Sequence, residues 1–452
     1  MTVYYPTSDQ VLRSKFGGLI WNVAELGADP TGVKDSTGAI QQAIDYCVAA
    51  GGGIVYLAAG SRYLVSKTIS ITGENVHLCG PGWAFPLVGG SNPVSRGTPL
   101  ATITPSAAFP SGSPVIDFNN TSYMINGCSV ENLSIDSHYL AGAVPNVPAI
   151  HFGNAAFFRI ANVILIQPTG SGILIDEAGA TYASPSTSQI YIENVNIFDG
   201  DSNGIEFAAN LFMTEVFIHD SYIWGLSGTG IKLGQSDGAF DIHVHNNAIG
   251  GCVAGIYCGT FETFIHDNAI YGTWGNGIEF ASTAAYGYMS KIHDNIIRDA
   301  DKYVNGSAGI MVDTGSYSLI ISDNICEKVN NTPEYGIVVV DGANDTAHNI
   351  YLDDSNFCVG NSIANYKSAA YEVTATRFNN GPQTAPAIPA SGTALTNPFP
   401  FDCTVYVAGG TVTAIDVGGT ATGMTSGPIA VAAGQTITLT YSAAPTWAWF
   451  GN

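Results

Sequence analysis

The feature that most restricts the fold of this 452-residue chain is a short sequence unit that returns at uneven intervals. A Gly-Ile pair occurs seven times between residues 172 and 337, with 22 to 32 residues from one pair to the next. A short β-rich run precedes each pair, such as FIHDSYI from residue 217 and FIHDNAI from residue 264. Runs this short, at a variable period, fit the coils of a parallel β-helix and not helical repeats or propeller blades.

In such a solenoid each strand pairs with the equivalent strand one coil later, about 4.8 Å away, so that like side chains stack in columns. The isoleucine of each Gly-Ile pair is expected to point inward, which gives a core column of Ile173, Ile205, Ile231, Ile256, Ile278, Ile310 and Ile337. Asparagines at the coil corner are expected to form one ladder that tolerates left-handed backbone, made of Asn162, Asn194, Asn247, Asn268, Asn295 and Asn324.

The open N-terminal end of such a stack needs a cover. Asp35 or Ser36 can cap the start of a helix, and the apolar residues at positions 39, 40, 43, 44, 47 and 48 fall on one helical face. Three glycines at 51–53 end this helix, and a strand pattern follows directly. We therefore expect a capping helix within residues 35–50.

The segment GADPTGVKDSTGAIQQAIDYCVAAGGGIVYLAAG, residues 27–60, resembles the start of the pectate-lyase-like β-helix superfamily. The shared elements are Asp-Ser-Thr, Ala-Ile-Gln-x-Ala-Ile and Gly-Gly-Gly-x-Val-Tyr-Leu, while Ala58 and Ala59 stand where proline is frequent. The resemblance covers residues 22–71 closely, and the coil pattern extends it to about residue 365. It implies an all-β, right-handed, single-stranded parallel β-helix, most similar to bacteriophage tailspike depolymerases. This fold hosts lyases, hydrolases, fructan-converting enzymes and adhesins, so the motif leaves the reaction open.

Pattern and composition divide the chain into five parts. We expect an N-terminal arm over 1–20, the capping helix and first coils over 21–95, the β-helix over 96–380, a linker over 381–398 and an antiparallel β module over 399–452. The terminal Trp-Ala-Trp-Phe run is too apolar for water, so the module either packs its own aromatic side chains or contacts symmetry mates. Three coils side by side would protect each other's flanks, which favours a homotrimer.

Charge and composition restrict the partner and the location. The chain has 14 Lys and Arg against 36 Asp and Glu, a formal net charge of −22, so it lacks the basic footprint of a nucleic-acid binder. A neutral or weakly charged partner is favoured, unless a cation such as Ca²⁺ bridges the acidic protein and an anionic ligand. We expect no cofactor. No apolar run is long enough for a membrane span, and no secretory signal pattern opens the sequence.

The eight cysteines are scattered without metal-ligand spacing, which indicates buried thiols in a chain that folds in a reducing compartment. We therefore expect a protein made in the cytoplasm that works outside the cell or on a virion.

The sequence contains neither the Asn-Thr-Asp, Asp-Asp, Gly-His-Gly and Arg-Ile-Lys set of polygalacturonases nor the arginine and aspartate pattern of calcium-dependent pectate lyases. A first internal candidate site is a column of histidines at equivalent positions of four coils, namely His219, His245, His266 and His293, with His243 on the same face. Outward imidazoles could bind a metal or act as acid and base. The alternative, which we favour because stacking alone selects like residues, is a polar column on a solvent face or trimer interface.

A second candidate site lies in the turns between the coil corner and Gly-Ile. These turns carry acids and aromatics that suit sugars, namely Asp199, Asp201, Trp224, Tyr271, Trp274, Asp299 and Asp301. Glycoside hydrolysis needs two carboxyls, and we expect them among Asp199, Asp201, Glu206 and Glu279. Asp201 with Glu206 is the preferred pair, because Glu206 and Glu279 share a column but stand three coils, or about 14 Å, apart.

The sequence thus predicts a polysaccharide-cleaving hydrolase. The enzymatic alternative is a polysaccharide lyase or a fructan-type intramolecular transglycosylase, and the non-enzymatic one is a glycan-binding adhesin. An elimination needs a base and a cation for the uronate carboxylate, and Lys232, Lys291, Arg298 and Lys302 are the few basic residues well placed along these coils.

Overall fold

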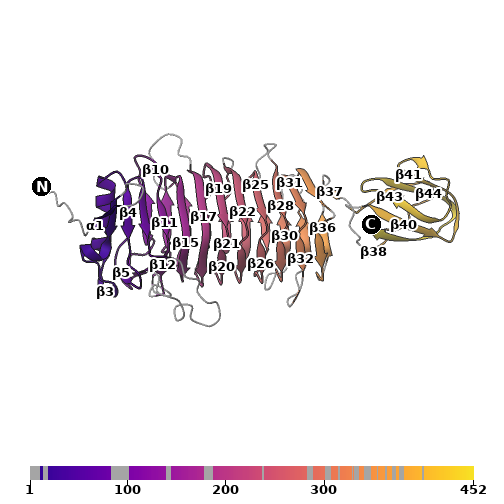
Figure 1. The fold of residues 1–452 in the computed structure, drawn as a ribbon. Helices are drawn as coiled ribbons and strands as arrows, with labels where there is room; N and C mark the ends of the chain where they lie inside the picture. The colour runs from indigo at the N-terminus through magenta and orange to yellow at the C-terminus, as the bar shows by residue number, and fades with distance from the viewer. Residues whose placement is uncertain are drawn as a thin grey trace.

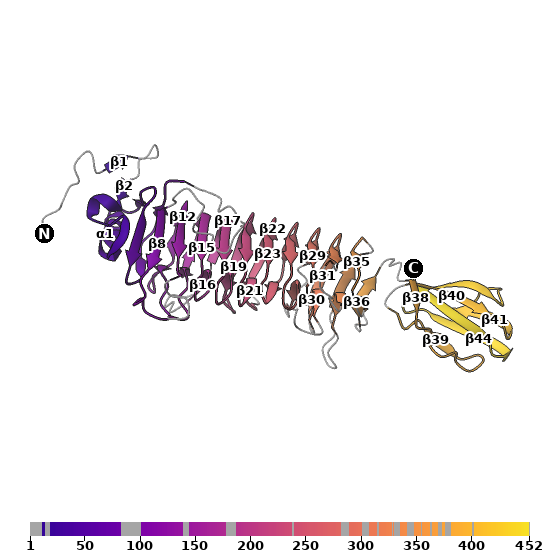
Figure 2. The ribbon, with the colours of Figure 1, turned by 90° about the horizontal axis from the view of Figure 1, so that it is seen from below.

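The structure is a computed structural model, in which the chain forms a long parallel β-helix followed by a small β-sandwich (Figures 1 and 2). It describes residues 11–13, 19–82, 101–138, 144–177, 187–236, 239–281, 289–300, 307–313, 316–327, 329, 335–340, 348–353, 355–361, 364–368, 373–375, 381–399 and 402–451. The predicted parallel β-helix with a helical cap is confirmed. The described part of the chain has no helix long and apolar enough to cross a membrane.

Two long sheets run along the β-helix, and their described strand pairs are parallel apart from the antiparallel pair of β1 with β2. Sheet A receives two strands from each regular coil and comprises β1 (Val11–Arg13), β2 (Leu19–Asn22), β3 (Thr31–Asp35), β4 (Gly53–Tyr56), β5 (Arg62–Val65), β7 (Val76–Cys79), β8 (Ala101–Pro105), β11 (Ser129–Glu131), β12 (Leu133–Asp136), β15 (Phe158–Ile166), β17 (Thr187–Phe198), β19 (Met213–His219), β20 (Tyr222–Trp224), β22 (Ala239–His245), β23 (Ala248–Gly250), β25 (Thr263–His266), β26 (Ala269–Tyr271), β28 (Ser290–His293), β29 (Ile296–Arg298), β31 (Tyr317–Ser322), β32 (Ile325–Glu327), β34 (His348–Leu352), β35 (Phe357–Val359) and β37 (Val373–Ala375).

Sheet B receives the third strand of each coil. It comprises β6 (Ile69–Ile71), β9 (Ile116–Asn119), β13 (Ile150–Gly153), β16 (Ile173–Asp176), β18 (Ile205–Phe207), β21 (Thr229–Leu233), β24 (Ala254–Cys258), β27 (Ile278–Phe280), β30 (Ala308–Val312), β33 (Tyr335–Val339) and β36 (Ala364–Ser368). A short pair, β10 (Ile125–Asn126) and β14 (Ala155–Ala156), lies beside the early coils.

The repeated Gly-Ile pairs build the core as predicted. Each isoleucine pairs in register with the isoleucine of the next coil, from Ile173 through to Ile337, and all seven side chains are fully buried. Burying an isoleucine side chain stabilises the fold by about 1.5–3 kcal/mol, so the column is a major part of the core.

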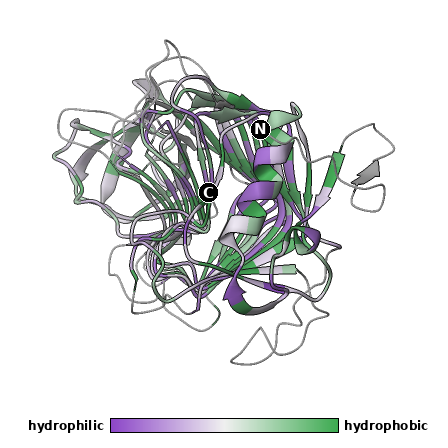
Figure 3. Ribbon diagram, turned by 90° about the vertical axis from the view of Figure 1, so that its left-hand side faces the viewer, coloured by the Kyte–Doolittle hydropathy of each residue, from purple (hydrophilic) through white to green (hydrophobic). Residues whose placement is uncertain are grey.

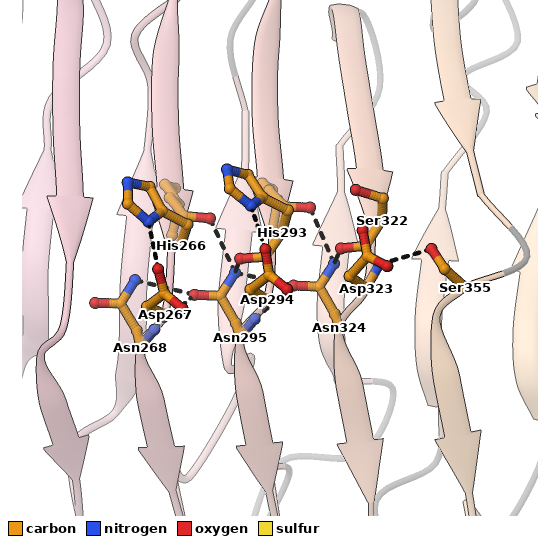
Figure 4. Close-up of polar contacts among 12 residues, drawn as sticks. His266, Asp267, Asn268, His293, Asp294, Asn295, Ser322, Asp323, Asn324 and Ser355 are labelled. Atoms are coloured by element: carbon orange, nitrogen blue, oxygen red, sulfur yellow. Dashed lines mark hydrogen bonds and ion pairs between the residues drawn. The ribbon is translucent and has the colours of Figure 1, made fainter.

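The prediction of one asparagine ladder is wrong, because the structure has two neighbouring columns. In the early coils Asn132, Asn162 and Asn194 have left-handed backbone and join through side-chain hydrogen bonds of 2.9 and 2.7 Å. From the next coil on, the left-handed position belongs to Asp220, Asn246, Asp267, Asp294 and Asp323. The residue after it forms a separate, buried ladder of Asn247, Asn268, Asn295, Asn324 and Asn356, with amide-to-amide distances of 2.9 to 3.0 Å (Figure 4).

Helix α1 (Thr37–Ala49), which follows the short 3-10 helix η1 (Val23–Leu26), covers the N-terminal end of the coils, as the view along the axis shows (Figure 3). Its buried side is Ile40, Ala43, Ile44 and Cys47. Of the two predicted caps, Asp35 binds the first helical N–H, since its carboxylate accepts from Thr37 N at 2.9 Å. The Ser36 hydroxyl instead accepts from Asp29 N.

The C-terminal module is a sandwich of two four-stranded antiparallel sheets. One sheet contains β38 (Gly381–Gln383), β45 (Thr446–Gly451), β40 (Cys403–Ala408) and β43 (Gly427–Val431); the other contains β39 (Ala394–Thr396), β44 (Thr436–Ala443), β41 (Thr411–Val417) and β42 (Thr420–Ala421). The segment 381–398, expected to be a linker, supplies β38 and β39, so the module starts earlier than its composition indicated. Trp449 is fully buried inside it, whereas Phe450 remains exposed.

Replacing Asn295 with alanine tests the buried ladder. The Asn295 amide donates to Asn324 and to Ile265 O and accepts from Asn268, so its loss leaves several buried polar groups unpaired. We expect a loss of about 2–4 kcal/mol in the free energy of unfolding, measured by urea denaturation. The matched control, Asn246→Asp, should change it by less than about 0.5 kcal/mol, because neighbouring coils already carry aspartate at that exposed left-handed position. An equal loss of unfolding free energy in both variants would contradict a stabilising role of the buried ladder.

Candidate functional site

The structure divides the predicted site residues among three places. The four histidines stand on the outer face of the first strands of sheet A, in β19, β22, β25 and β28. Asp199 and Asp201 lie in the turn between β17 and β18, and Trp224, Tyr271, Trp274 and Asp299 lie in or beside the equivalent turns of later coils. Glu206 and Glu279 lie on the outer face of sheet B. Asp301 is outside the described residues.

The histidines form a regular stack. Successive rings are 4.9 Å apart and within 6 to 9° of parallel. His219, His266 and His293 each place Nδ1 2.7 to 2.8 Å from the aspartate that follows, and Figure 4 shows the last two of these pairs. These aspartates hold the left-handed corner positions. Each of these three histidines therefore holds the carboxylate of a corner residue in place, which is a structural role for the column.

The fourth histidine, His245, is followed by an asparagine and so lacks this partner. Burial lowers the pKa of His245, and the neighbouring His219 and His266 lower it further.

The stacking does not suit a shared metal ion. Two nitrogens on one zinc lie at most about 4.2 Å apart, twice the usual Zn–N distance, whereas parallel rings 4.9 Å apart keep equivalent nitrogens farther than that. Within the part of the chain that the structure describes, no group of three or more His, Cys, Asp or Glu side chains could hold a metal ion.

In the turns, two exposed indoles offer contact area for a ligand. Trp224 packs against Gly250, where an added Cβ would lie 2.2 Å from the indole ring. Trp224 is nevertheless 39% exposed. Trp274 is equally exposed and stands two residues before Asn276, which leads into β27. Exposed indoles beside polar groups suit the apolar faces of sugar rings. Tyr271 is partly covered instead, since the Arg298 guanidinium lies 6.0 Å from its ring centre.

The acids in the turns differ in their environments. Asp199 and Asp299 both have left-handed backbone. Burial raises the pKa of Asp199, although much of its side chain still faces solvent. The carboxylate of Asp299 is buried and accepts from Val329 N at 2.7 Å, so it closes a turn. Asp201 is exposed.

On sheet B, Glu206 and Glu279 belong to one outward column, as the repeat predicted. The register runs Glu206, Lys232, Tyr257, Glu279, Met311, so the two glutamates are three coils apart. Burial raises the pKa of Glu206, but hydrogen bonds from Ser171, Asn203 and Lys232 outweigh it and hold the pKa below its usual value. The Asn203 and Lys232 bonds are both 2.9 Å. Glu206 is thus a fixed anion and a poor proton donor.

Glu279 has a second carboxyl nearby that sequence reasoning missed. Met311 pairs with Glu279 in register, and Asp313 is the next outward residue of the same coil. Burial and the charge of Glu279 raise the pKa of Asp313. Tyr257 is the register partner of Glu279, and burial together with the charges of Glu279 and Asp313 raises the pKa of its hydroxyl. The Asn276 amide donates to Glu279 at 2.9 Å and fixes its orientation.

The signal for Asp313 was present in the sequence. The strand GIMVD has an acid at the second outward position after Gly-Ile, where GIEFA and GIKLG have alanine and glycine. Only the register shows that this position lies diagonally across from Glu279.

An ionised cluster on earlier coils of the same face was also missed. The buried ring of His151 lies between two aspartates, 2.7 Å from Asp117 and 2.9 Å from Asp176. Burial lowers the pKa of His151, but the two carboxylates outweigh it and raise the pKa to about 9. Because the three residues come from β9, β13 and β16, the cluster clamps three coils together.

A separate cluster on sheet A is centred on the buried carboxylate of Asp136. Asp136, at the end of β12, is 3.2 Å from the Arg62 guanidinium and 2.8 Å from His138 Nδ1. It ties the first coils together, at a place remote from Glu279 in the coil order.

Comparison with known proteins gives a family match over much of the chain. A model of the family described as rhamnogalacturonase A/epimerase, pectate lyase-like, matches residues 20–279. The chain is 26% identical to polygalacturonase QRT3 of Arabidopsis thaliana over 56% of its own length and 50% of that protein. It is 48% identical over 69 residues to mannuronan C5-epimerase AlgE2 of Azotobacter vinelandii, which is 14% of this chain and 7% of that protein. The chain therefore spans half or less of these relatives.

Two solved structures have a similar fold. A DFA-IIIase from Arthrobacter chlorophenolicus matches with a TM-score of 0.56 and 12% identity, over 80% of this chain and 95% of that one. The Dettilon tailspike protein matches with a TM-score of 0.52 and 14% identity, over 96% and 94%. At these identities the likeness concerns the fold alone.

The His151 clamp makes stability depend on pH. The pKa is about 9 in the folded protein against 6.5 for a free histidine, so the stabilisation is complete below pH 6.5 and is lost as the pH rises through about 9. We expect the free energy of unfolding to fall by about 3 kcal/mol between pH 6 and 10 through this group. His151→Gln should lack that part of the decrease, while His293→Gln should keep it. If the free energy of unfolding of the wild type and of His151→Gln changed with pH in the same way, the charged state described for the clamp would be wrong.

Proposed function

Because the chain belongs to the rhamnogalacturonase A/epimerase, pectate-lyase-like family, we propose that it is a carbohydrate-active enzyme that hydrolyses glycosidic bonds of a polysaccharide. One observation supports hydrolysis most directly. Glu279 and Asp313 are two carboxyls on one outer face whose environments differ, since one is oriented by Asn276 and the other has a raised pKa. A pair of this kind supplies an acid and a base in one site.

The separation of the pair favours inversion. Neighbouring strands lie about 4.8 Å apart and residues two apart on a strand about 6.6 Å, so a diagonal pair of Cα atoms is about 8 Å apart. Inverting glycosidases hold their carboxyl groups about 6.5–9.5 Å apart, which leaves room for a water molecule, and side chains that rise from one face at this Cα spacing can hold that separation. Glu279 with Asp313 therefore replaces Asp201 with Glu206 as the proposed catalytic pair.

In this proposal Asp313 is the general acid. Its proton passes to the glycosidic oxygen as the bond from that oxygen to the anomeric carbon breaks. Glu279 accepts a proton from water, and the water oxygen bonds to the anomeric carbon from the opposite face. The products together gain one water, Asp313 ends ionised and Glu279 protonated, and solvent exchange restores both. Tyr257, which stays protonated, donates a hydrogen bond to the sugar.

The remaining predicted residues bind substrate in this arrangement. Trp274 precedes Asn276 in the turn that leads into β27, so we propose its exposed indole as a sugar platform in the same coil as Glu279. Glu206 and Lys232 form an ion pair two to three coils before the catalytic pair and offer an acceptor and a donor to sugar hydroxyls. A glycan along this column would run parallel to the axis of the β-helix.

The charge of the face favours an uncharged substrate. Among the side chains that the structure describes, those facing outward on sheet B include the acids Asp117, Asp176, Glu206, Glu279 and Asp313 and the cations His151 and Lys232. Together with the net charge of −22, this face repels a polyanionic chain.

A second candidate reaction is elimination on a uronate. It is favoured by Lys232, a partly exposed cation in the same column as Tyr257 that could hold a uronate carboxylate. A non-catalytic adhesin on this scaffold would bind glycan without forming product.

Substitution of the pair tests the reaction. Glu279→Gln and Asp313→Asn should each lower kcat by at least about 100-fold, because each removes one partner of acid–base catalysis. The matched control Asp267→Asn changes the same charge at an exposed corner beside sheet A and should leave kcat unchanged. The assay follows a panel of neutral and acidic polysaccharides by mass spectrometry, and we expect fragments of neutral glycans that carry one added water.

The other outcomes separate the alternatives. Unsaturated or anhydro fragments would replace hydrolysis by elimination or cyclisation. Full activity in both carboxyl variants would remove Glu279 and Asp313 from the reaction. Binding of a glycan without any product would favour a non-catalytic adhesin over an enzyme.

We also propose that the chain acts as a homotrimer outside the cell or on a virion. The fold likeness to a tailspike protein supports this, as does the low charge of residues 381–452, which contain Asp402 and Asp416 as their charged residues. Tyr406 and Phe450 are exposed on one face of this module. Light scattering should give a molar mass of three times 47.1 kDa, about 141 kDa. In the double variant Tyr406→Ser, Phe450→Ser, this mass should fall toward that of one chain. A monomer in the unaltered protein would contradict the trimer.

A further inference from the structure

Near the C-terminal end of the β-helix, two cysteines face each other across paired strands. Cys326 is the middle residue of β32 and Cys358 the middle residue of β35, and the two are register partners. Their exposed fractions are 1% and 8%. Both are free thiols. Across the described residues, no other two of the eight cysteines are partners on paired strands.

The geometry of this pair is close to that of a disulfide. Partner residues on parallel strands have Cα atoms about 4.8 Å apart, within the range of about 4.4–6.8 Å that disulfides span. The two thiols are in contact, since a hydrogen bond to Cys358 raises the pKa of Cys326, and burial raises it further. In-register partners also keep their Cβ atoms about 4.8 Å apart, slightly beyond the roughly 3.5–4.5 Å of disulfides, so bond formation needs the two strands to approach by a few tenths of an ångström.

We propose that Cys326 and Cys358 form a disulfide when the protein leaves a reducing compartment. The oxidant is a low-molecular-weight disulfide. The Cys358 sulfur attacks it, forming a mixed disulfide and releasing one small thiol; the Cys326 sulfur then attacks Cys358, forming the protein disulfide and releasing the second. Two protein thiols are oxidised, one small disulfide is reduced, and the two protein protons pass to the released thiols. This proposal is independent of the proposed function.

The position of the pair gives the bond a purpose. Among the described strands β35 pairs with β32 alone, so Cys358 stands on the last described rung of its column. Its neighbours Phe357 and Val359 point outward and are exposed. A disulfide between β32 and β35 would fasten two successive coils to each other.

The same position makes the reaction slow but feasible. A buried thiol with a raised pKa reacts poorly while the fold is closed. Terminal elements open more readily than the middle of a fold, and Cys358 is the more exposed member of the pair. We therefore expect Cys358 to react first and Cys326 to resolve the mixed disulfide.

Incubation of the folded full chain with oxidised glutathione tests the proposal. We expect the mass to fall by about 2 Da, two fewer thiols to react with an alkylating reagent after unfolding, and one cross-linked peptide pair that contains Cys326 and Cys358. The oxidised protein should unfold several degrees higher than the reduced one, because the bond restricts the unfolded chain.

Cysteine variants complete the test. Cys358→Val and Cys326→Val should each prevent the mass loss and the stabilisation, and circular dichroism checks that they fold. The matched control Cys252→Val removes a buried cysteine that lies in a turn, and should keep both effects. Persistence of all eight free thiols after oxidation, or glutathione on Cys358 without the cross-link, would overturn the proposal.

Discussion

The structure depends on the axial pairing of each strand with the equivalent strand of the next coil. This pairing fixes the neighbour of every side chain on the strands as the residue at the same position one coil away. Inward positions then become a continuous isoleucine core, and the polar corner becomes a ladder of buried amides whose hydrogen bonds run along the axis. Insertions can accumulate in the turns, as the uneven repeat shows, because they leave this pairing unchanged.

The same constraint explains how a site can arise on a flat outer face. A column presents one side chain per coil, so two carboxyls in one column are either adjacent or several coils apart. Glu206 and Glu279 are separated in this way. In the proposed catalytic pair, Asp313 lies at the neighbouring outward position, diagonally across from Glu279. Asp117, Asp176 and Glu206 on this face are bound to His151 or to Lys232.

The sequence predicted the features that depend on repetition, namely the β-helix, the inward isoleucines and the histidine stack, and its local pattern predicted the helix that covers the first coil. It failed where the outcome depends on a single residue of register. The corner aspartate takes the left-handed position, which moves the asparagine one place into the core. Asp313 and the His151 clamp were missed for a related reason, since their partners come from other coils of unequal length. The strands in 381–398 were hidden by a composition typical of linkers.

The central claim is that substrate lies along the outer face of sheet B. The most direct measurement is a crystal structure of the Asp313→Asn variant with an oligosaccharide from a polysaccharide that the protein binds. The account predicts sugar rings along the column from Glu206 to Glu279, with a glycosidic oxygen within hydrogen-bond distance of residue 313. Sugar bound along the histidine column of sheet A, with the face of sheet B empty, would contradict it.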